Sequence, residues 1–286
     1  MGRAARGRPA ELAPRRVHRG HGRRAAHHPP GGPRPGLRAI PGGPSVMEDG
    51  NRPGPPTRAG RVSEGLLIAL DTATTTAVVA LGDQSGSSRA ETSWAAGYRH
   101  GEELLTRIDG LLAEQGAAVG DLTGIIVGTG PGAFTGLRVG LASAKGLAVG
   151  LGLPLVGVPT SLALMDAASR GLQAVASLAL LVPAGPSDRV LVSDGSARLL
   201  PGGEDPDLEA GTLLLAVDLA GRAPEQSIRL GERAVDGLGA ALLRMGAARL
   251  AAGARDDVGQ LVPEYVTLPR GISRLSGEVA WSRGRQ

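Results

Sequence analysis

Cysteine is absent from the 286 residues of this chain, which excludes a disulfide framework, a thiol nucleophile and thiolate metal sites. Histidine is scarce after residue 60, where His100 is the only one. A Ser-His-Asp arrangement in this part of the chain would have to use His100, and none can be assembled. A single imidazole also does not make a metal site. The sequence therefore lacks the usual catalytic equipment of a hydrolase.

Acidic residues are scarce in the first part of the chain. Residues 1–60 hold 12 arginines against three acidic residues, a net charge of +9, whereas residues 61–286 carry a net charge of −5. The basic character of the whole chain thus belongs to its first 60 residues. The mildly acidic remainder is a poor autonomous nucleic-acid binder.

Large apolar residues are rare in residues 1–61, which are rich in Arg, Pro, Gly and His. Such a segment cannot bury enough surface to offset its ordering entropy, so we expect disorder. It can be interpreted as a basic RNA-binding arm, as a weak metal binder, or as the product of a start codon placed too early, with Met47 or a residue near Val62 as the true start. The sequence favours the last interpretation. No apolar stretch follows the charges, so a secretory signal is not indicated and we expect a cytoplasmic protein.

The stretch from Gly124 to Pro159 organises the rest of the chain. Its sequence, GIIVGTGPGAFTGLRVGLASAKGLAVGLGLPLVGVP, predicts a strand at Gly124–Val127, a glycine-rich turn, a helix at Thr135–Gly150 and a strand at Leu153–Val158. One helix joining two short strands implies parallel strands with a right-handed crossover. Charged residues interrupt the helix, which argues against a membrane span.

Three interpretations of the glycine-rich turn compete. Gly128, Gly130 and Ala133 fit a dinucleotide-binding fingerprint, but the next acidic residue along the chain is Asp166, too far on to hold a ribose. A P-loop needs a lysine at the turn, whereas Lys145 lies deep in the helix. The third interpretation is structural: the glycines let the turn and the helix pack closely against another segment.

The segment LLIALDTATTTAVVAL, residues 66–81, predicts two apolar strands joined by a polar turn. It resembles the first phosphate-binding hairpin of the actin, hexokinase and Hsp70 ATPases, in which backbone N–H groups and hydroxyls hold phosphate and the aspartate holds Mg²⁺ through water. The residues that match are Asp71, Thr72, Thr74 and Thr75. An ordinary threonine-rich hairpin is the alternative.

Helical spacing marks two further segments. In His100–Glu114 the leucines and Ile108 form one apolar stripe. In Thr135–Gly150 a small residue recurs at every fourth position, a pattern that lets another backbone come close. Beyond residue 159 we expect a helix over residues 159–171, strands at 176–182, 190–193 and 213–219, and a helix over residues 234–252.

The motif GTGPGAFTGLRVGLASAKGLA resembles the signature of the bacterial YeaZ/TsaB proteins, a family of tRNA threonylcarbamoyladenosine biosynthesis. Their turn has the form G-P-G-x-F-T-G-L-R, which matches Gly130–Arg138 and includes Phe134, the only phenylalanine of the chain. The resemblance extends from Leu66 to about Arg270. The segment PEYVTLPRG resembles the family's closing P-x-Y-x-R-x-P segment but lacks its arginine, since Val266, Thr267 and Leu268 stand there.

The resemblance implies an α/β protein with the actin/hexokinase/Hsp70-like fold of two ribonuclease-H-like lobes, the second of them reduced. We expect the first lobe over residues 62–172, the second over residues 173–271, and a loose tail over residues 272–286.

The resemblance also implies a protein that is not itself a catalyst. TsaB-like proteins pair with a TsaD-like paralogue that transfers a threonylcarbamoyl group to adenosine 37 of tRNAs reading codons beginning with A, and a TsaE-like ATPase joins them. We therefore expect a heterodimer, contact with tRNA only through the complex, a homodimer as a possible state of the lone chain, and no contact with membranes. No cofactor is expected unless a nucleotide binds in the complex.

Two enzymatic alternatives stay open. A metal-dependent, glycoprotease-like peptidase would place a second ligand of an H-x-x-x-H pair at Leu104, which cannot bind metal. A sugar-kinase-like phosphotransferase needs a catalytic aspartate in the second half, where Asp188 and Asp194 are the candidates.

The family's heterodimer suggests that the two helices form a four-helix contact with the partner. We expect Gly140→Leu to weaken that contact without affecting the isolated chain; the alternative is that both helical stripes face inward. The residues expected at the contact are His100, Leu104, Leu105, Ile108, Leu112, Phe134, Thr135, Arg138, Gly140, Leu141 and Ala144.

Overall fold

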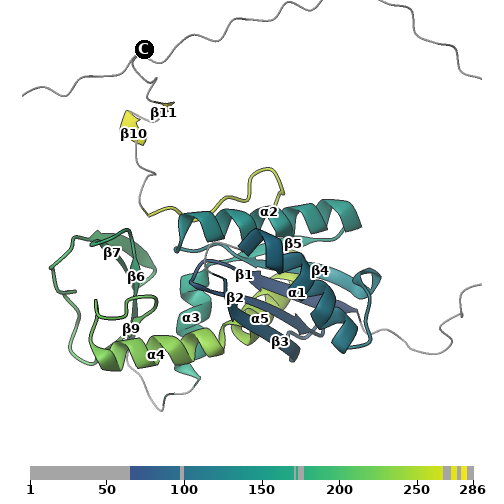
Figure 1. Ribbon diagram of the computed structural model, residues 1–286, viewed down its shortest axis with the longest axis horizontal. Coiled ribbons are helices and arrows are strands. Elements are labelled where there is room, and N and C mark those ends of the chain that lie inside the picture. Colours follow the sequence, from purple (N-terminus) through teal and green to yellow (C-terminus); the bar gives the residue numbers. More distant parts are fainter. Residues whose placement is uncertain are drawn as a thin grey trace, which may run out of the picture. The chain divides into compact units, whose positions relative to one another are not determined.

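The computed structural model describes residues 65–96, 100–170, 172, 177–266, 272–275 and 278–281 (Figure 1). The segment 1–61, for which disorder was predicted, lies outside these ranges, and so does the side chain of His100. Within the described ranges, no helix is both long and apolar enough to cross a membrane.

The first sheet is built around the predicted hairpin and the predicted crossover. Its strands have the order β3-β2-β1-β4-β5; β1 pairs antiparallel with β2 and parallel with β4, and β4 pairs parallel with β5. Helix α2 (Phe134–Leu151) joins β4 to β5, which confirms the predicted parallel pair. The strands are β1 (Leu66–Asp71), β2 (Thr76–Gly82), β3 (Ser88–Ala95), β4 (Leu122–Gly128) and β5 (Leu155–Val158).

Both faces of this sheet are covered by helices. Alternate residues of β1 point to opposite faces: Ile68 belongs to the core under α2 and α1 (His100–Glu114), and Ala69 to the core under α5 (Leu238–Ala251). Every residue of β1 is therefore buried. The short helix η1 (Val119–Asp121) leads from α1 into β4.

The second sheet repeats the pairing of the first sheet without a fifth strand. It has the order β8-β7-β6-β9, with β6 antiparallel to β7 and parallel to β9, as β1 is to β2 and β4. Its strands are β6 (Ser177–Pro183), β7 (Arg189–Ser193), β8 (Ser196–Leu200) and β9 (Thr212–Ala216). The prediction of two related lobes, the second reduced, is confirmed.

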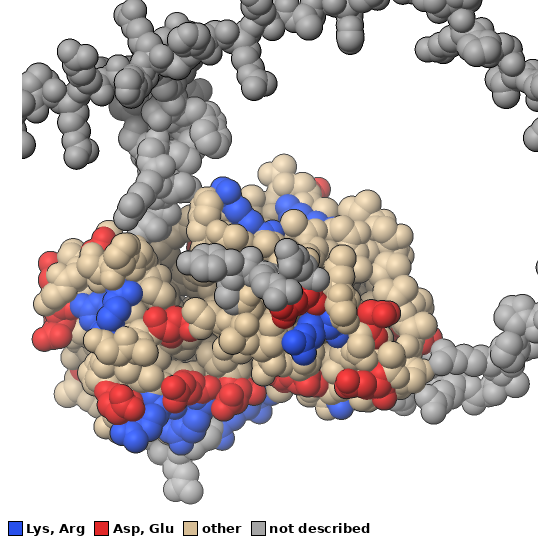
Figure 2. Space-filling model, in the orientation of Figure 1, with Lys and Arg blue, Asp and Glu red and all other residues tan. Residues whose placement is uncertain are grey.

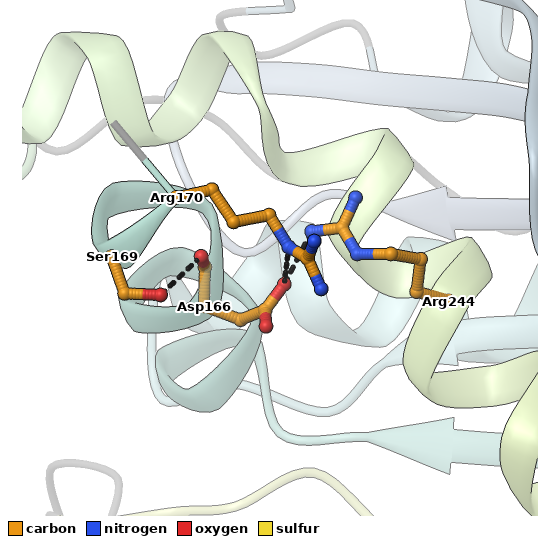
Figure 3. A network of polar contacts seen from close by, with 4 residues as sticks. All are labelled: Asp166, Ser169, Arg170 and Arg244. Atoms are coloured by element: carbon orange, nitrogen blue, oxygen red, sulfur yellow. Dashed lines mark hydrogen bonds and ion pairs between the residues drawn. The ribbon is translucent and has the colours of Figure 1, made fainter. Parts of the chain in front are cut away.

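Helices α3 (Thr160–Ser169) and α5 lie between the two sheets in one continuous apolar core. Asp166 of α3 joins them: its carboxylate accepts hydrogen bonds from Arg170 Nε at 3.3 Å and from Arg244 of α5 (Figure 3). Ser169 Oγ donates to the Asp166 carbonyl at 2.8 Å. This network fixes the helix that begins at Thr160, a residue of the site described below.

The end of the described chain returns to the first sheet. After α5, Asp256 N–H donates to Leu155 O at 2.9 Å, Gly157 N–H donates to Asp256 Oδ2 at 2.7 Å, and Glu264 N–H donates to the Thr129 carbonyl at 2.8 Å. The sequence boundary between residues 172 and 173 stays a prediction, but α5 and the segment after it pack on the first sheet.

Three elements differ from the sequence-based prediction. The helix predicted over residues 234–252 is two helices, α4 (Glu225–Asp236) and α5, which meet at Gly237. Charged residues line α4, as Figure 2 shows at lower left, and Arg229 lies 4.0 Å from Glu225. Strand β8 was not predicted, and the segment expected to be a loose tail contains the paired strands β10 (Ile272–Leu275) and β11 (Glu278–Trp281).

Candidate functional site

The glycine-rich turn packs directly on the hairpin that joins β1 to β2. A methyl group at Gly128 would overlap Asp71 Oδ2, and one at Gly132 would overlap the Ala73 carbonyl oxygen. Gly130 has a φ of +102°, a conformation that side chains rarely allow. Ala133 N–H, at the start of α2, donates to the Ala73 carbonyl at 2.7 Å. The glycines thus permit close packing, in agreement with the structural interpretation of the turn.

Asp71, at the end of β1, is fully buried and holds three segments together. Its Oδ1 accepts a hydrogen bond from Ala73 N–H at 2.7 Å, and its Oδ2 accepts one from the Thr160 hydroxyl at 2.6 Å. Thr160 Oγ1 in turn accepts from Gly130 N–H at 3.0 Å. Burial raises the pKa of Asp71 to about 6, against the opposing effect of the two hydrogen bonds.

The three threonines predicted to bind phosphate all have partners within the chain. The Thr72 hydroxyl donates to the Gly136 carbonyl in the first turn of α2 at 2.7 Å. The Thr74 hydroxyl donates to the Thr76 carbonyl at 2.7 Å and accepts from Thr76 N–H at 3.2 Å. Thr75 donates to the carboxylate of Asp218, a residue of the second sheet's half of the chain.

This hairpin does not fit a bound nucleotide as it stands. Both oxygens of Asp71 are engaged and shielded from solvent, so no water-bridged Mg²⁺ can reach them. The donors of Thr75 are engaged by a carboxylate. The structure brings the predicted residues together, but as a packed junction.

The apolar stripes of α1 and α2 face inward. On α1 the exposed fractions of Leu104, Ile108 and Leu112 are 0%, 3% and 2%, because these side chains pack in the core between the helices and the first sheet. Leu105 is 55% exposed, so it points the other way. The prediction that the stripe on α1 forms the partner contact is wrong for the three buried residues.

The small residues of α2 pack inward as well. Leu141 and Ala144 lie in the same core, and a methyl group at Gly140 would overlap the Thr72 hydroxyl oxygen. The prediction that these residues form a partner contact is therefore wrong. Because Thr72 is buried and hydrogen-bonded, we now expect Gly140→Leu to destabilise the isolated chain, contrary to the expectation from the sequence. The side chains left on the exposed surface of the two helices include Leu105, Thr135, Arg138 and Val149.

An aromatic and cationic cluster lies at the start of α2. The sequence did not predict that its residues come together. The Arg138 guanidinium lies 3.7 Å from the centre of the Phe134 ring, and Arg138 Nε donates to the Tyr265 hydroxyl at 3.1 Å. The two rings are 5.3 Å apart. The resemblance of residues 263–271 to a family segment was the only sequence signal for Tyr265.

Phe134 and Tyr265 also line a cavity of about 880 Å³ that reaches the turn between β6 and β7. The cavity is largely apolar, and the carboxylates of Asp188 and Glu264 stand at its wall. The Thr129 hydroxyl donates to Glu264 at 3.0 Å, while partial burial raises the pKa of the Glu264 carboxyl.

Both aspartates considered for a phosphotransferase lie in the described part of the second half of the chain. Asp188 accepts hydrogen bonds from Gly202 N–H at 3.1 Å and the Ser187 hydroxyl at 3.3 Å. Asp194 is exposed in the turn between β7 and β8. Among the described side chains, no three His, Asp or Glu residues come close enough together to hold a metal ion.

The central part of the chain is similar in sequence to known protein families. The sequence model described as TsaD, tRNA N6-adenosine threonylcarbamoyltransferase, matches residues 95–219. The tRNA threonylcarbamoyladenosine biosynthesis protein TsaB of Escherichia coli is 35% identical over 104 residues, which cover 36% of this chain and 44% of that protein. TsaB of Haemophilus influenzae is 36% identical over 102 residues, covering 36% and 42%. The matched segments thus span less than half the length of these curated relatives.

One solved structure supports the fold over a longer range. YeaZ from Pseudomonas aeruginosa superposes with a TM-score of 0.56 and 24% identity, covering 70% of this chain and 99% of that chain. The likeness agrees with the α/β, actin/hexokinase/Hsp70-like fold of two mixed sheets described above. The central part of the chain is thus similar in sequence to TsaB proteins and to the TsaD model, and the chain is similar in fold to YeaZ.

Proposed function

We propose that this protein is a non-catalytic partner subunit of a TsaD-like enzyme. In this role it supports the N6-threonylcarbamoylation of adenosine 37 in tRNAs that read codons beginning with A. The assembly would also include a TsaE-like ATPase, and the chain would contact tRNA only through the complex.

The packing of the hairpin on the glycine-rich turn is the observation that carries this proposal. In an ATPase of this fold the hairpin holds phosphate and its aspartate faces a hydrated Mg²⁺. Here Asp71 has no exposed surface, and its two oxygens join the hairpin to Thr160. A chain that uses this junction for its own packing is suited to a structural role.

The exposed surface of α1 and α2 supports a partner contact of a different kind from the one first predicted. Leu105 is 55% exposed and Val149 is 70% exposed, whereas Leu104, Leu111, Leu112, Leu137 and Leu141 of the same two helices are buried. Exposed apolar side chains on neighbouring helices are suited to burial against a second pair of helices. We place the contact on this outer surface, with Thr135 and Arg138 beside it.

Reconstitution of the modification tests the proposal. Unmodified tRNA is incubated with ATP, a threonylcarbamoyl donor system, and the TsaD-like and TsaE-like proteins of the source cell, with and without the full chain. We expect threonylcarbamoyladenosine, measured by mass spectrometry of digested tRNA, to depend on the chain. Equal yields with and without the chain would contradict the proposal.

The enzymatic alternatives are tested with the chain alone. A peptidase would cleave glycosylated or plain peptide substrates after metal addition, and a phosphotransferase would convert ATP to ADP in the presence of a sugar. We expect neither product above a buffer control, and sustained turnover of either substrate would favour the enzyme.

A further inference from the structure

Asp218 binds the loop of the first hairpin from the other half of the chain. It follows β9, the strand of the second sheet that corresponds to β4. Its Oδ2 accepts a hydrogen bond from Thr75 N–H at 2.7 Å, and its Oδ1 accepts one from the Thr75 hydroxyl. One carboxylate therefore takes both donors of a single loop residue.

The loop holds these donors in place independently of Asp218. The Thr74 hydroxyl is bonded to both the N–H and the carbonyl of Thr76, and Ala73 N–H is bonded to Asp71. Thr72 and Thr74 are buried, whereas Thr75 is exposed. The hairpin thus presents a fixed N–H and O–H pair at its surface, and Asp218 is the group that occupies the pair.

Asp218 adopts a backbone conformation that is uncommon for a residue with a side chain. Its φ is +59°, in the left-handed region, which aspartate tolerates better than most residues. Such conformations persist where surrounding contacts maintain them. The two bonds to Thr75 are contacts of this kind.

A carboxylate and a phosphoryl group present similar pairs of anionic oxygens, and backbone N–H groups in turns bind both. We propose that Thr75 is an anion-binding position and that Asp218 fills it from within the chain. This contact between Asp218 and Thr75, here called the latch, closes the hairpin to phosphate groups. The inference does not depend on the partner role proposed above.

Competition explains why an intramolecular carboxylate suffices. A group tethered beside its site has an effective concentration in the millimolar range or higher. The hairpin loop Thr72–Thr75 contains no lysine or arginine that would strengthen the binding of an external anion. Free phosphate therefore competes for a weak site that the Asp218 carboxylate already occupies. Removing this carboxylate makes the Thr75 donors available to phosphate.

Asp218→Gly tests the latch, because glycine keeps the backbone conformation and removes the carboxylate. The probe is inorganic phosphate, titrated at constant ionic strength with chloride as the reference, and the readouts are the chemical shift and hydrogen exchange of the Thr75 amide in the full chain. We expect the amide to be protected in the wild type and exposed in the variant. Phosphate should restore protection in the variant, with half-saturation at about a tenfold lower concentration than in the wild type.

Asp194→Gly is the matched control. Asp194 also has a positive φ, 49°, and its replacement removes the same charge from the turn between β7 and β8, whereas the hairpin bonds are made by Asp218. We expect this control to behave as the wild type. Asp218→Asn, which keeps the side-chain shape and one acceptor, should give an intermediate response and serves if the glycine variant does not fold.

Two results would overturn the inference. The first is a Thr75 amide that stays protected in Asp218→Gly without phosphate. The second is an equal response to phosphate in Asp218→Gly and Asp194→Gly, because general charge loss would then account for it.

Discussion

Asp71 and its hydrogen-bond partners decide how the central junction is built. A carboxylate with no exposed surface is costly unless its oxygens are bonded, and the Thr160 hydroxyl and Ala73 N–H supply one bond to each oxygen. Burial still raises its pKa, from an ordinary value near 3.8 to about 6. The residue therefore carries a proton in the folded chain over a pH range in which the unfolded chain has released it.

The free energy of unfolding should depend on this proton. Between pH 4 and pH 6 the folded state binds more protons at Asp71 than the unfolded state does, so the contribution of Asp71 to stability falls as the pH rises. The pKa change, from 3.8 to about 6, corresponds to roughly 3 kcal/mol. Asp71→Asn does not titrate, so the stability of the wild type relative to this variant should be greatest near pH 4 and shrink toward pH 7.

Urea denaturation of both proteins across this range measures the difference directly. Subtracting the two curves removes the titration of groups that the proteins share. A difference that is constant, or that grows between pH 4 and pH 7, would contradict the burial argument for Asp71.

At the scale of elements, one face of helix α2 packs against the rest of the fold and another is exposed. Gly140 faces the Thr72 hydroxyl, whereas a methyl group at Gly146 would meet nothing within 4 Å. Two glycines of one helix thus occupy opposite environments. Their replacements separate helix propensity from packing.

We expect Gly140→Ala to destabilise the chain by about 1–3 kcal/mol, because the buried Thr72 side chain must move. Gly146→Ala should stabilise it by about 0.5–1 kcal/mol, because alanine favours a helix over glycine. Thermal and urea unfolding of the two variants check the pair. Stabilisation by both would mean that α2 is not packed on the hairpin.

Elements with strong periodicity could be predicted from the sequence, and others could not. Helix α1 begins at His100 and ends at Glu114, as its leucine spacing predicted. Helix α4 was missed because its twelve residues include only three large apolar ones, Ile228, Leu230 and Val235, beside five charged ones. The apolar stripe of α1 predicted the helix but not whether the stripe faces the core or a partner, since the spacing is the same in both cases.

At the scale of the whole molecule, contacts between distant parts of the sequence define the site. Asp71 lies 89 residues from Thr160, and Thr75 lies 143 residues from Asp218. A single sequence contains no periodic signal for such pairs, so the hairpin was recognised while its closure by Asp218 was not. The family motif located the glycine-rich turn, and the structure then assigned each of its glycines a packing role.

We propose that the outer surface of α1 and α2 is where the partner binds. Leu105→Glu combined with Val149→Glu places two charges on that surface, where both side chains are largely exposed. The thermal unfolding of the lone chain should therefore stay the same. Leu162→Glu is the matched control, since Leu162 is 41% exposed on α3, away from the proposed contact.

The affinity of the full chain for the TsaD-like protein of the source cell, measured by calorimetry for the wild type and these variants, tests the central claim most directly. We predict a stable complex with the wild type and with Leu162→Glu, and an affinity about tenfold or more weaker for the double variant, because charges would be buried against apolar partner surface. No binding by the wild type, or equal binding by all three proteins, would contradict the account.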